Sequence, residues 1–327
     1  MAMKVLSLAP LPAELVKAFI LQTADVPDFD VMYGHEMSDD EMKIAMSKAD
    51  VVFGDYTFKK WITEDIVSAA LKVKLIQQPS AGYTHIDVDA CTRKGIKVAN
   101  TAGANTVSVA EHTIACALCL IRNMFYANSS TKMGRWEQMQ VKPMELKGKV
   151  WGLVGFGRIG QAVSKRIKAF ELDSILYYDI FRQDPSVEQE LQAQYCELHE
   201  LLGRSDIISI HTPLNDNTRN MIDEGAVQAI KKGAYLINVA RAEVVDEKAL
   251  ASAVSMGRLN GAGIDVFSEE PITPQNPLLA VQSDKLILTP HVAGVSNEAA
   301  AAIMNMAAAN VARVLKGEEP ESVVNNL

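Results

Sequence analysis

The chain has 327 residues, 48% of them hydrophobic and 22% charged, with a formal net charge of −8. This composition is typical of a soluble globular protein with room for two domains. The negative, well-mixed charge argues against a nucleic-acid surface, and no apolar run reaches the length of a membrane span. The N-terminal stretch, with its single lysine, does not resemble a signal peptide.

Short apolar runs alternate with helical patterns along the whole chain, which is typical of parallel α/β sheets. One group of predicted strands occupies the first hundred residues: Val5–Leu8, Val51–Gly54, Leu75–Gln77 and Lys97–Ala99. A second group follows: Val150–Val154, Ile175–Tyr178, Ile207–His211, Tyr235–Val239, Gly263–Val266 and Leu286–Leu288. The first turn of the second group carries the glycine run Gly155-Phe156-Gly157-Arg158-Ile159-Gly160, the spacing of a pyrophosphate-binding loop. We therefore predict a Rossmann dinucleotide-binding domain at residues 101–290, inserted into a smaller flavodoxin-like α/β substrate domain formed by residues 1–100 and 291–327.

The join near residue 105 predicts the start of a long helix. Ser108 and Glu111 have the spacing of a capping box, and the pattern continues to about Tyr126. This helix is more apolar than a solvent-facing one should be. Burial at a subunit interface is the favoured explanation, and burial inside the monomer is the alternative.

The same helix carries Cys116 and Cys119, with His112 one turn earlier, a spacing that suits a metal or redox site. Buried thiols are also common in apolar helices, and we prefer the interpretation that these cysteines are structural. We predict no metal site.

The tail of the chain predicts one further helix. Ser296 is a plausible N-cap, Glu298 lies in the first turn, and Gly317 is a plausible C-cap. A single helix cannot form a domain, so we expect it to return to the N-terminal unit.

The run Gly155-Phe156-Gly157-Arg158-Ile159-Gly160 lies between a predicted strand and a predicted helix. The first glycine permits a tight turn, the second permits close approach of a pyrophosphate, and the third permits close packing of helix on strand. The free amides and positive dipole end of the helix would bind the phosphates.

Asp179 follows the next predicted strand, 19 residues after Gly160. A carboxylate there would accept hydrogen bonds from the adenosine ribose and repel a 2′-phosphate. NAD is therefore favoured over NADP, although Arg182, three residues on, could soften that preference.

Three charged side chains follow late strands, where open α/β sheets bind ligands. They are Arg241, Glu270 and His291. With these residues in view, the chain resembles the NAD-dependent D-2-hydroxyacid dehydrogenases, which include phosphoglycerate, hydroxypyruvate/glyoxylate and D-lactate dehydrogenases. The resemblance extends over nearly the whole chain and rests on these stretches: AGYTHID, ANTVSVAEH, GFGRIG, HTPLNDNTRNMI, NVARAEVVD, GIDVFSEEP and TPHVAG.

The resemblance implies a catalytic role for each of the three. Arg241 would hold the substrate carboxylate and touch the reacting carbonyl, which suits a planar guanidinium that keeps its charge. His291 would exchange a proton with the carbonyl oxygen as hydride is transferred. Glu270 would hydrogen-bond the imidazole, orient it and favour its protonated form.

The resemblance also implies binding residues. The substrate carboxylate would be bound by the loop Ser80-Ala81-Gly82-Tyr83, together with Arg241 and His291. Besides the glycine loop and Asp179, the cofactor would be lined by Thr106, His211, Thr212, Pro213, Thr218, Val239, Ala240, Asp265 and Gly294.

Some positions depart from the family pattern. Ala242 replaces the usual glycine after the arginine, which is tolerable at negative φ. Gln78 and Gly54-Asp55 stand where phosphoglycerate enzymes typically place arginines, which argues against a phosphorylated substrate, although Lys59 and Lys60 are near in sequence. Trp136 could reach a substrate cleft or simply pack in its loop.

We therefore predict a cytoplasmic, homodimeric, NAD-dependent D-2-hydroxyacid dehydrogenase that acts on a small unphosphorylated substrate of the glyoxylate or hydroxypyruvate kind. The enzymatic alternative is a D-3-phosphoglycerate dehydrogenase. The alternative from another class is an NAD-sensing corepressor-like binding protein of the same fold. Neither a nucleic acid nor a membrane is expected as a partner.

Overall fold

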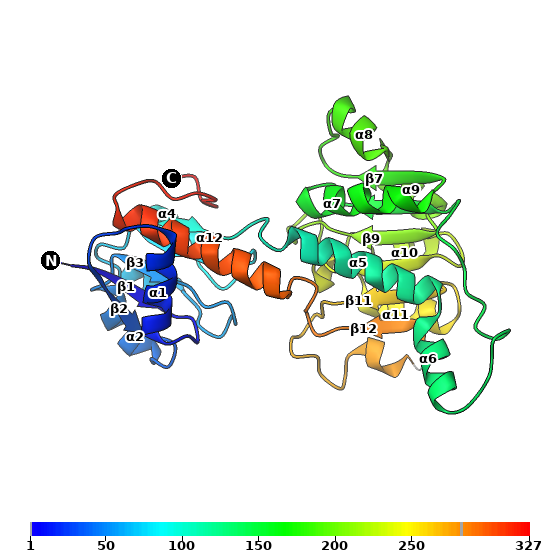
Figure 1. Ribbon diagram of the computed structural model, residues 1–327, viewed down its shortest axis with the longest axis horizontal. Coiled ribbons are helices and arrows are strands. Elements are labelled where there is room, and N and C mark those ends of the chain that lie inside the picture. Colours follow the sequence, from blue (N-terminus) through cyan, green and yellow to red (C-terminus); the bar gives the residue numbers. More distant parts are fainter. Residues whose placement is uncertain (1, 282–283) are drawn as a thin grey trace. The chain divides into compact units, whose positions relative to one another are not determined.

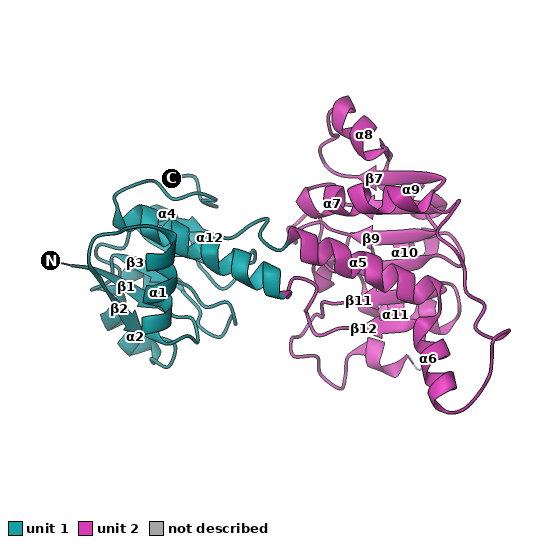
Figure 2. Cartoon of the chain, viewed as in Figure 1, with its two compact units in different colours: residues 1–105, 297–327 teal, residues 106–296 magenta. Residues whose placement is uncertain are grey.

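The computed structural model of the protein describes residues 2–281 and 284–327. The chain forms two compact units (Figure 2): unit 1 is residues 1–105 with 297–327, and unit 2 is residues 106–296. The divisions fall after residues 105 and 296, not after residues 100 and 290 as expected. The first division coincides with the start of a helix at Thr106, and before the second the chain is still hydrogen-bonded to Asp265 of unit 2.

Unit 1 is a parallel sheet of five strands in the order β2-β1-β3-β4-β5, the flavodoxin-like order. Figure 1 shows its strands β1, β2 and β3 beside the helices α1 and α2. Its strands are β1 (Met3–Ser7), β2 (Phe29–Tyr33), β3 (Val51–Phe53), β4 (Leu75–Gln77) and β5 (Lys97–Ala99). Its helices are α1 (Ala13–Thr23), α2 (Asp39–Met46), α3 (Glu64–Ser68), α4 (Val88–Arg93) and α12 (Asn297–Leu315). Helices α1 and α12 share the apolar cluster on one face, while α2, α3 and α4 cover the other.

Unit 2 is a parallel sheet of seven strands in the order β12-β11-β10-β9-β6-β7-β8, which is the Rossmann order with one more parallel strand. Its strands are β6 (Val150–Val154), β7 (Ser174–Tyr178), β8 (Ala193–Tyr195), β9 (Ile207–Ile210), β10 (Tyr235–Asn238), β11 (Gly261–Ile264) and β12 (Leu286–Leu288). Its α-helices are α5 (Thr106–Ile121), α6 (Met124–Lys132), α7 (Arg158–Ile167), α8 (Pro185–Leu191), α9 (Leu198–Arg204), α10 (Glu224–Ala229) and α11 (Glu247–Ser255). Its short 3₁₀ helices are η1 (Lys168–Phe170), η2 (Ala242–Val244) and η3 (Pro277–Ala280).

Both faces of the unit 2 sheet are covered, which explains why its strands are apolar almost without a break. Along β6, Trp151 and Leu153 join the cluster under α5 and α7, whereas Val154 joins the cluster under α9, α10 and α11. Because all strands are parallel, their carboxyl ends and the loops that follow share one edge of the sheet.

The predicted fold class is confirmed, and every strand expected from the sequence is present within two residues at each end. The strands β2 and β8 were missed. Both are sheet edges, where only one neighbour supplies hydrogen bonds, and β8 spans only three residues with an exposed glutamine at its centre. A strand as short and half-exposed as β8 carries too little hydrophobic pattern to be recognised, whereas β2, with the sequence FDVMY, is largely apolar and was simply overlooked.

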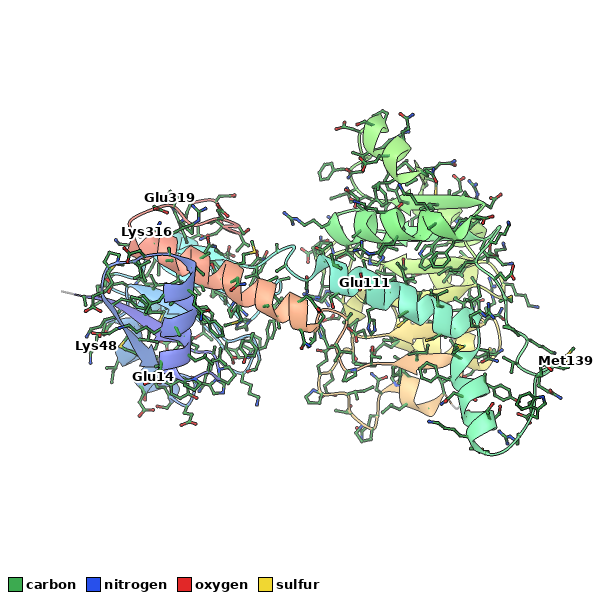
Figure 3. The ribbon with its side chains drawn as sticks, viewed as in Figure 1. Glu14, Lys48, Glu111, Met139, Lys316 and Glu319 are labelled. Atoms are coloured by element: carbon green, nitrogen blue, oxygen red, sulfur yellow. The ribbon has the colours of Figure 1, made fainter. Side chains whose placement is uncertain are left out.

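Two expectations about the first helix of unit 2 were wrong: its capping box and its C-terminal end. The helix begins at Thr106, so Ser108 lies inside its first turn, and the Ser108 hydroxyl donates to the Ala293 carbonyl (2.7 Å) rather than forming a capping box. Glu111, labelled in Figure 3, pairs instead with Arg166 on α7. The helix ends at Ile121, because Asn123 adopts a left-handed conformation (φ 52°) before α6 begins.

The apolar face of α5 is buried against the sheet of its own unit, which is the alternative that the sequence left open beside a subunit interface. Its Cys116 and Leu120 lie where a side chain at Gly263 or Gly261 would stand. Burial raises the pKa of the Cys116 thiol to about 12. This thiol is therefore protonated at neutral pH and unsuited to redox or metal chemistry.

The tail helix is present as predicted. α12 starts directly after Ser296, and Gly317 (φ 80°) follows its end, where the Glu318 amide donates to the Arg313 carbonyl. It packs against α1 within unit 1. No helix in the described part of the chain is long and apolar enough to span a membrane.

Candidate active site

The glycine loop lies between β6 and α7, and two of its glycines are sterically required. Gly155 has φ 94°, and a Cβ there would lie 2.8 Å from the backbone of His211 and Thr212 at the end of β9. A Cβ at Gly160 would lie 2.3 Å from the Gly155 carbonyl oxygen. Both positions therefore exclude any side chain, because the obstructing atoms belong to the backbone.

Gly157 differs, since a Cβ there would meet no atom within 4 Å. It precedes the first turn of α7, where helix amides lack intrahelical acceptors. Open space in front of a helix N-terminus is what a pyrophosphate needs. Arg158 and Ile159 begin the helix itself.

Asp179 follows β7, and its carboxylate turns toward the glycine loop. Its Oδ2 accepts a hydrogen bond from the Phe156 amide (2.6 Å). The Phe156 ring is fully buried and stacks on Tyr177 of β7, with 4.1 Å between the ring centroids. Strand β7 therefore positions both groups: Asp179 follows it directly, and its Tyr177 packs against Phe156 of the glycine loop.

His211 and Thr212 follow β9 beside Gly155, and both carry buried polar atoms without a partner among the described residues. The Trp151 indole donates to the Ser209 hydroxyl, whose oxygen also lies 2.9 Å from Nε2 of His211. Nδ1 of His211 has no partner among the described residues, and burial lowers the pKa of the ring to about 3. A neutral ring nitrogen and a hydroxyl, both unsatisfied beside the glycine loop, suit a polar ligand.

The loop after His211 is closed by Thr218, whose hydroxyl donates to the Pro213 carbonyl (2.6 Å). The side chain of Thr218 is buried, so it shapes the loop rather than facing outward.

The turn after β10 positions Arg241 through Asn238, which sequence reasoning missed. The buried Asn238 side chain accepts from the Ala240 amide and donates to the Arg241 carbonyl, so it fixes the segment Val239–Arg241. Ala242 opens η2 with negative φ, which explains why alanine is tolerated where the family has glycine. A buried asparagine directly before an arginine at a strand end was the available signal.

His291 and Glu270 form a hydrogen-bonded pair, with 2.7 Å between Nδ1 and Oε2. The second oxygen of Glu270 accepts from the Phe267 amide (3.0 Å). Burial favours the neutral acid, but the hydrogen bonds from His291 and Phe267, with the charges of His291 and Arg241, lower the pKa of Glu270 below its usual value. Glu270 is therefore ionised at neutral pH, and Arg241 lies near enough to act on it electrostatically.

The backbone of His291 is strained, because φ is 54° and non-glycine residues rarely adopt this left-handed conformation. Asp265, only 1% exposed, holds the flanking residues: its carboxylate accepts from the Thr289 hydroxyl (2.5 Å) and from the Val292 and Ala293 amides. Asp265, expected at the nicotinamide, thus also fixes the loop that carries His291.

Helix α5 supports this loop from the other side. His112 Nε2 lies 3.2 Å from the Thr289 hydroxyl oxygen, and Ser108 donates to the Ala293 carbonyl just before Gly294. Thr106, expected near the cofactor, is the first residue of the same helix. The contribution of α5 was not foreseen, because its partners are distant in sequence.

Unit 1 carries the loop expected to bind the substrate carboxylate. The Ser80 hydroxyl donates to the Gly82 carbonyl, and Asn100 donates to the Ala81 carbonyl (2.8 Å). Tyr83 ends the loop and packs against the adjoining apolar cluster. This loop belongs to unit 1, whereas Arg241, Glu270 and His291 all belong to unit 2.

Gln78 and Asp55 lie fully buried at the ends of β4 and β3. The Asp55 carboxylate accepts from the amides of Thr57, Lys59 and Lys60. Lys60 Nζ donates to the Met37 carbonyl. This end of the unit 1 sheet therefore presents a buried carboxylate and a neutral amide.

The fold, the glycine loop and the acid after β7 together define a nicotinamide-dinucleotide-dependent dehydrogenase of two α/β units. The family model described as "D-isomer specific 2-hydroxyacid dehydrogenase, NAD binding domain" matches residues 114–293. The chain belongs to the family of D-isomer specific 2-hydroxyacid dehydrogenases, whose members are NAD-dependent oxidoreductases.

Individual relatives agree with this assignment. The chain is 40% identical over 268 residues to the glyoxylate reductase of Thermofilum pendens, covering 81% of this chain and 78% of the relative. It is 37% identical to the D-3-phosphoglycerate dehydrogenase of Methanocaldococcus jannaschii, covering 98% of this chain but 59% of that protein. The D-lactate dehydrogenase of Aquifex aeolicus, solved with NAD and lactic acid, superimposes with a TM-score of 0.82 at 30% identity and 96% coverage of both chains.

Proposed function

We propose that the protein interconverts a small, unphosphorylated D-2-hydroxy acid and its 2-keto acid, with Arg241, Glu270 and His291 as catalytic residues. The observation that carries this proposal is the 2.7 Å pair between His291 and Glu270, held at the edge of the sheet that also carries the glycine loop. Bound NAD(H) would supply or accept the hydride.

Each of the three residues has a distinct role in this proposal. His291 would use Nε2 to exchange a proton with the substrate oxygen, since Nδ1 is engaged by Glu270. Ionised Glu270 would orient the ring and stabilise its positive charge. Arg241, set by Asn238 at the end of β10, would bind the substrate carboxylate and polarise the reacting carbonyl.

The other proposed binding residues contact either the substrate or the cofactor. The amides of the Ser80–Tyr83 loop would share the substrate carboxylate. Residues of the glycine loop and the start of α7 would bind the pyrophosphate, and Asp179 would bind the adenosine ribose, which favours NAD. Thr106 and Asp265 would approach the nicotinamide end. The rest of the cofactor cleft would be lined by these residues: His211, Thr212, Pro213, Val239, Ala240 and Gly294, with Thr218 holding the loop in shape.

The preference for an unphosphorylated substrate is supported by charge. A phosphate dianion needs cationic partners, and the strand ends of unit 1 carry Gln78 and the carboxylate of Asp55. Glyoxylate and hydroxypyruvate are therefore favoured over 3-phosphohydroxypyruvate.

A panel assay tests the proposal. NADH oxidation, followed by absorbance, is measured with glyoxylate, hydroxypyruvate, pyruvate and 3-phosphohydroxypyruvate, with NADPH in parallel. We expect the highest kcat/KM with NADH and an unphosphorylated acid. Preference for the phosphorylated acid would make the protein a phosphoglycerate dehydrogenase. NADH binding without turnover on any acid would favour a binding protein of the same fold.

We also propose that the protein is a homodimer. Large apolar side chains are exposed on α6 and in the segment after it, including Trp136 (86% exposed) and Met139 (81%, labelled in Figure 3). Exposed apolar groups so close in sequence suit a second copy of the chain. Sedimentation equilibrium checks this: replacing Trp136 and Phe125 by lysine should yield monomers, whereas a wild-type monomer would contradict the proposal.

A cytoplasmic location is proposed from the thiols. All four cysteines are free, and three of them are buried, as expected for a protein of a reducing compartment. Fractionation of the source cells, with an antibody to the chain, tests this.

A further inference from the structure

Arg182, the single cation of the segment after Asp179, is already bound by a carboxylate. Its Nε donates to Oε1 of Glu188 (2.9 Å) and its Nη2 donates to Oε2 (3.0 Å). This is the bidentate geometry in which arginine binds carboxylates and phosphates most strongly. Glu188 lies on α8, six residues further along the chain.

Glu188 is itself held in place. The Tyr177 hydroxyl donates to its Oε1 (2.7 Å), and the Gln183 amide donates to that hydroxyl (3.0 Å). The Glu188 side chain is 14% exposed, whereas that of Arg182 is 63% exposed. The Glu188 carboxylate is therefore fixed by its own hydrogen bonds, and the more exposed Arg182 guanidinium binds to it there.

The Arg182 guanidinium is restrained on a second side, because it lies over the Tyr195 ring, 5.8 Å from the centroid. A cation–π contact of this kind adds to the cost of moving the side chain. Two contacts therefore keep the arginine on the α8 and β8 side of its loop.

This arrangement bears on the cofactor. A 2′-phosphate is normally accommodated by an arginine near the acid that follows the second strand of the Rossmann unit. Arg182 has the right chemistry and the right place in the sequence, but its fork is occupied. A 2′-phosphate would have to displace Glu188 and would meet Asp179 as well.

We propose that Glu188 is a specificity-determining residue, which withholds Arg182 from the adenosine ribose site and so excludes NADP together with Asp179. The inference rests on the proposed dinucleotide site at Asp179. Selectivity for NAD then depends on two carboxylates: Asp179 acts directly, and Glu188 acts by neutralising the neighbouring cation.

The test uses the full chain and nucleotides that report on the adenosine end alone. Dissociation constants for adenosine 5′-monophosphate and adenosine 2′,5′-bisphosphate are measured by calorimetry on wild type, D179S, E188Q and D179S/E188Q. Glutamine keeps the size of Glu188 and an acceptor for Tyr177 but loses the charge. In the D179S background, E188Q should tighten bisphosphate binding about tenfold, the worth of one charge-assisted hydrogen bond.

Two further variants isolate the role of Arg182. Adding R182A to D179S/E188Q should abolish the gain. R182A alone should leave bisphosphate affinity as it is in wild type, because the arginine is not available there. E190Q is the matched control, since it removes the same charge from the same helix without touching the pair.

The outcomes separate the inference from the function on which it rests. Monophosphate binding verifies the fold when E188Q, E190Q and R182A each leave it as it is in the parent to which they are added, wild type or D179S. If E188Q leaves the bisphosphate-to-monophosphate ratio unchanged, or E190Q changes it equally, the role of Glu188 is refuted while the dinucleotide site stands. If R182A alone weakens bisphosphate binding, the arginine is free and the proposal is wrong. If wild type binds neither nucleotide, the dinucleotide site itself is refuted and the inference with it.

Discussion

Nδ1 of His291 lies 2.7 Å from Oε2 of Glu270, although the two residues are 21 positions apart and follow different strands. The pairing leaves Nε2 as the ring nitrogen able to exchange a proton with a substrate. It also couples an exposed imidazole to a carboxylate whose second oxygen is fixed by the Phe267 amide.

Replacing His291 by alanine should lower kcat by roughly 10²- to 10⁴-fold, the usual worth of general acid–base help. NADH affinity, measured by fluorescence, should stay close to that of wild type, because the proposed cofactor contacts lie elsewhere. His199→Ala, at an exposed position on α9, is the control and should change neither kcat nor NADH affinity. Near-normal turnover of the His291 variant would remove this residue from proton transfer.

Replacing Glu270 by glutamine should change how stability depends on pH. The pKa of Glu270 is lowered in the folded protein by the hydrogen bonds from His291 and Phe267, which outweigh burial. Its contribution is therefore present above the unfolded value of about 4.3 and lost as pH falls through the lower folded value. Melting temperatures should differ most between wild type and variant near pH 7, and the gap should close below about pH 4. A pH-independent gap would contradict the assignment.

His211 should contribute acid sensitivity of its own. Burial lowers its pKa to about 3, so the unfolded chain binds a proton between about pH 6.5 and pH 3 that the folded chain does not. Stability from this group is therefore present above pH 6.5 and lost as pH falls, by at most about 1.4 kcal/mol per pH unit. Urea unfolding of His211→Gln across this range should show a shallower slope than wild type, and equal slopes would refute the shift.

Replacing Asp265 by asparagine should free the loop that carries His291. The amide would supply a donor where the Val292 and Ala293 amides and the Thr289 hydroxyl all need acceptors. We expect a loss of about 2 kcal/mol in unfolding free energy, because buried donors are left unsatisfied, and a lower kcat. NADH affinity is measured alongside, because Asp265 is also a proposed cofactor residue.

Thr289→Ser, which keeps the hydroxyl, serves as the conservative comparison and should retain most of the activity. Thr289→Val should resemble the Asp265 variant. If Thr289→Val is as active as Thr289→Ser, the loop does not depend on this hydrogen bond.

Replacing Gly160 by alanine should destabilise unit 2 and weaken NADH binding, since the added Cβ would lie 2.3 Å from the Gly155 carbonyl oxygen and α7 would have to move off its strand. Gly203→Ala is the matched control: it lies within α9, where the nearest atom is 3.9 Å away. That control should stabilise the protein by about 0.5–1 kcal/mol, the helix preference of alanine over glycine. Equal effects of the two substitutions in thermal unfolding would contradict the packing described for the loop.

Features encoded within a short stretch of chain could be predicted from the sequence. The central strands are recognisable because burial on both faces demands continuous apolar residues, as along Val150–Val154. The glycine loop and Asp179 are recognisable because one strand–turn–helix unit sets their spacing. The wrong prediction of a capping box has the converse cause, because it used local spacing alone. Ser108 and Glu111 have that spacing, but their partners, Ala293 and Arg166, are distant in sequence.

By itself, the sequence determined the fold class, the positions of the main strands along the chain and the candidate residues, because each depends on periodicity or spacing along the chain. Only the tertiary structure decided how those residues are held: Asp265 across the loop of His291, Asn238 under Arg241, and Glu188 on Arg182. Hydrogen bonds and ion pairs need atoms within a few ångströms, and folding alone determines which side chains come that close.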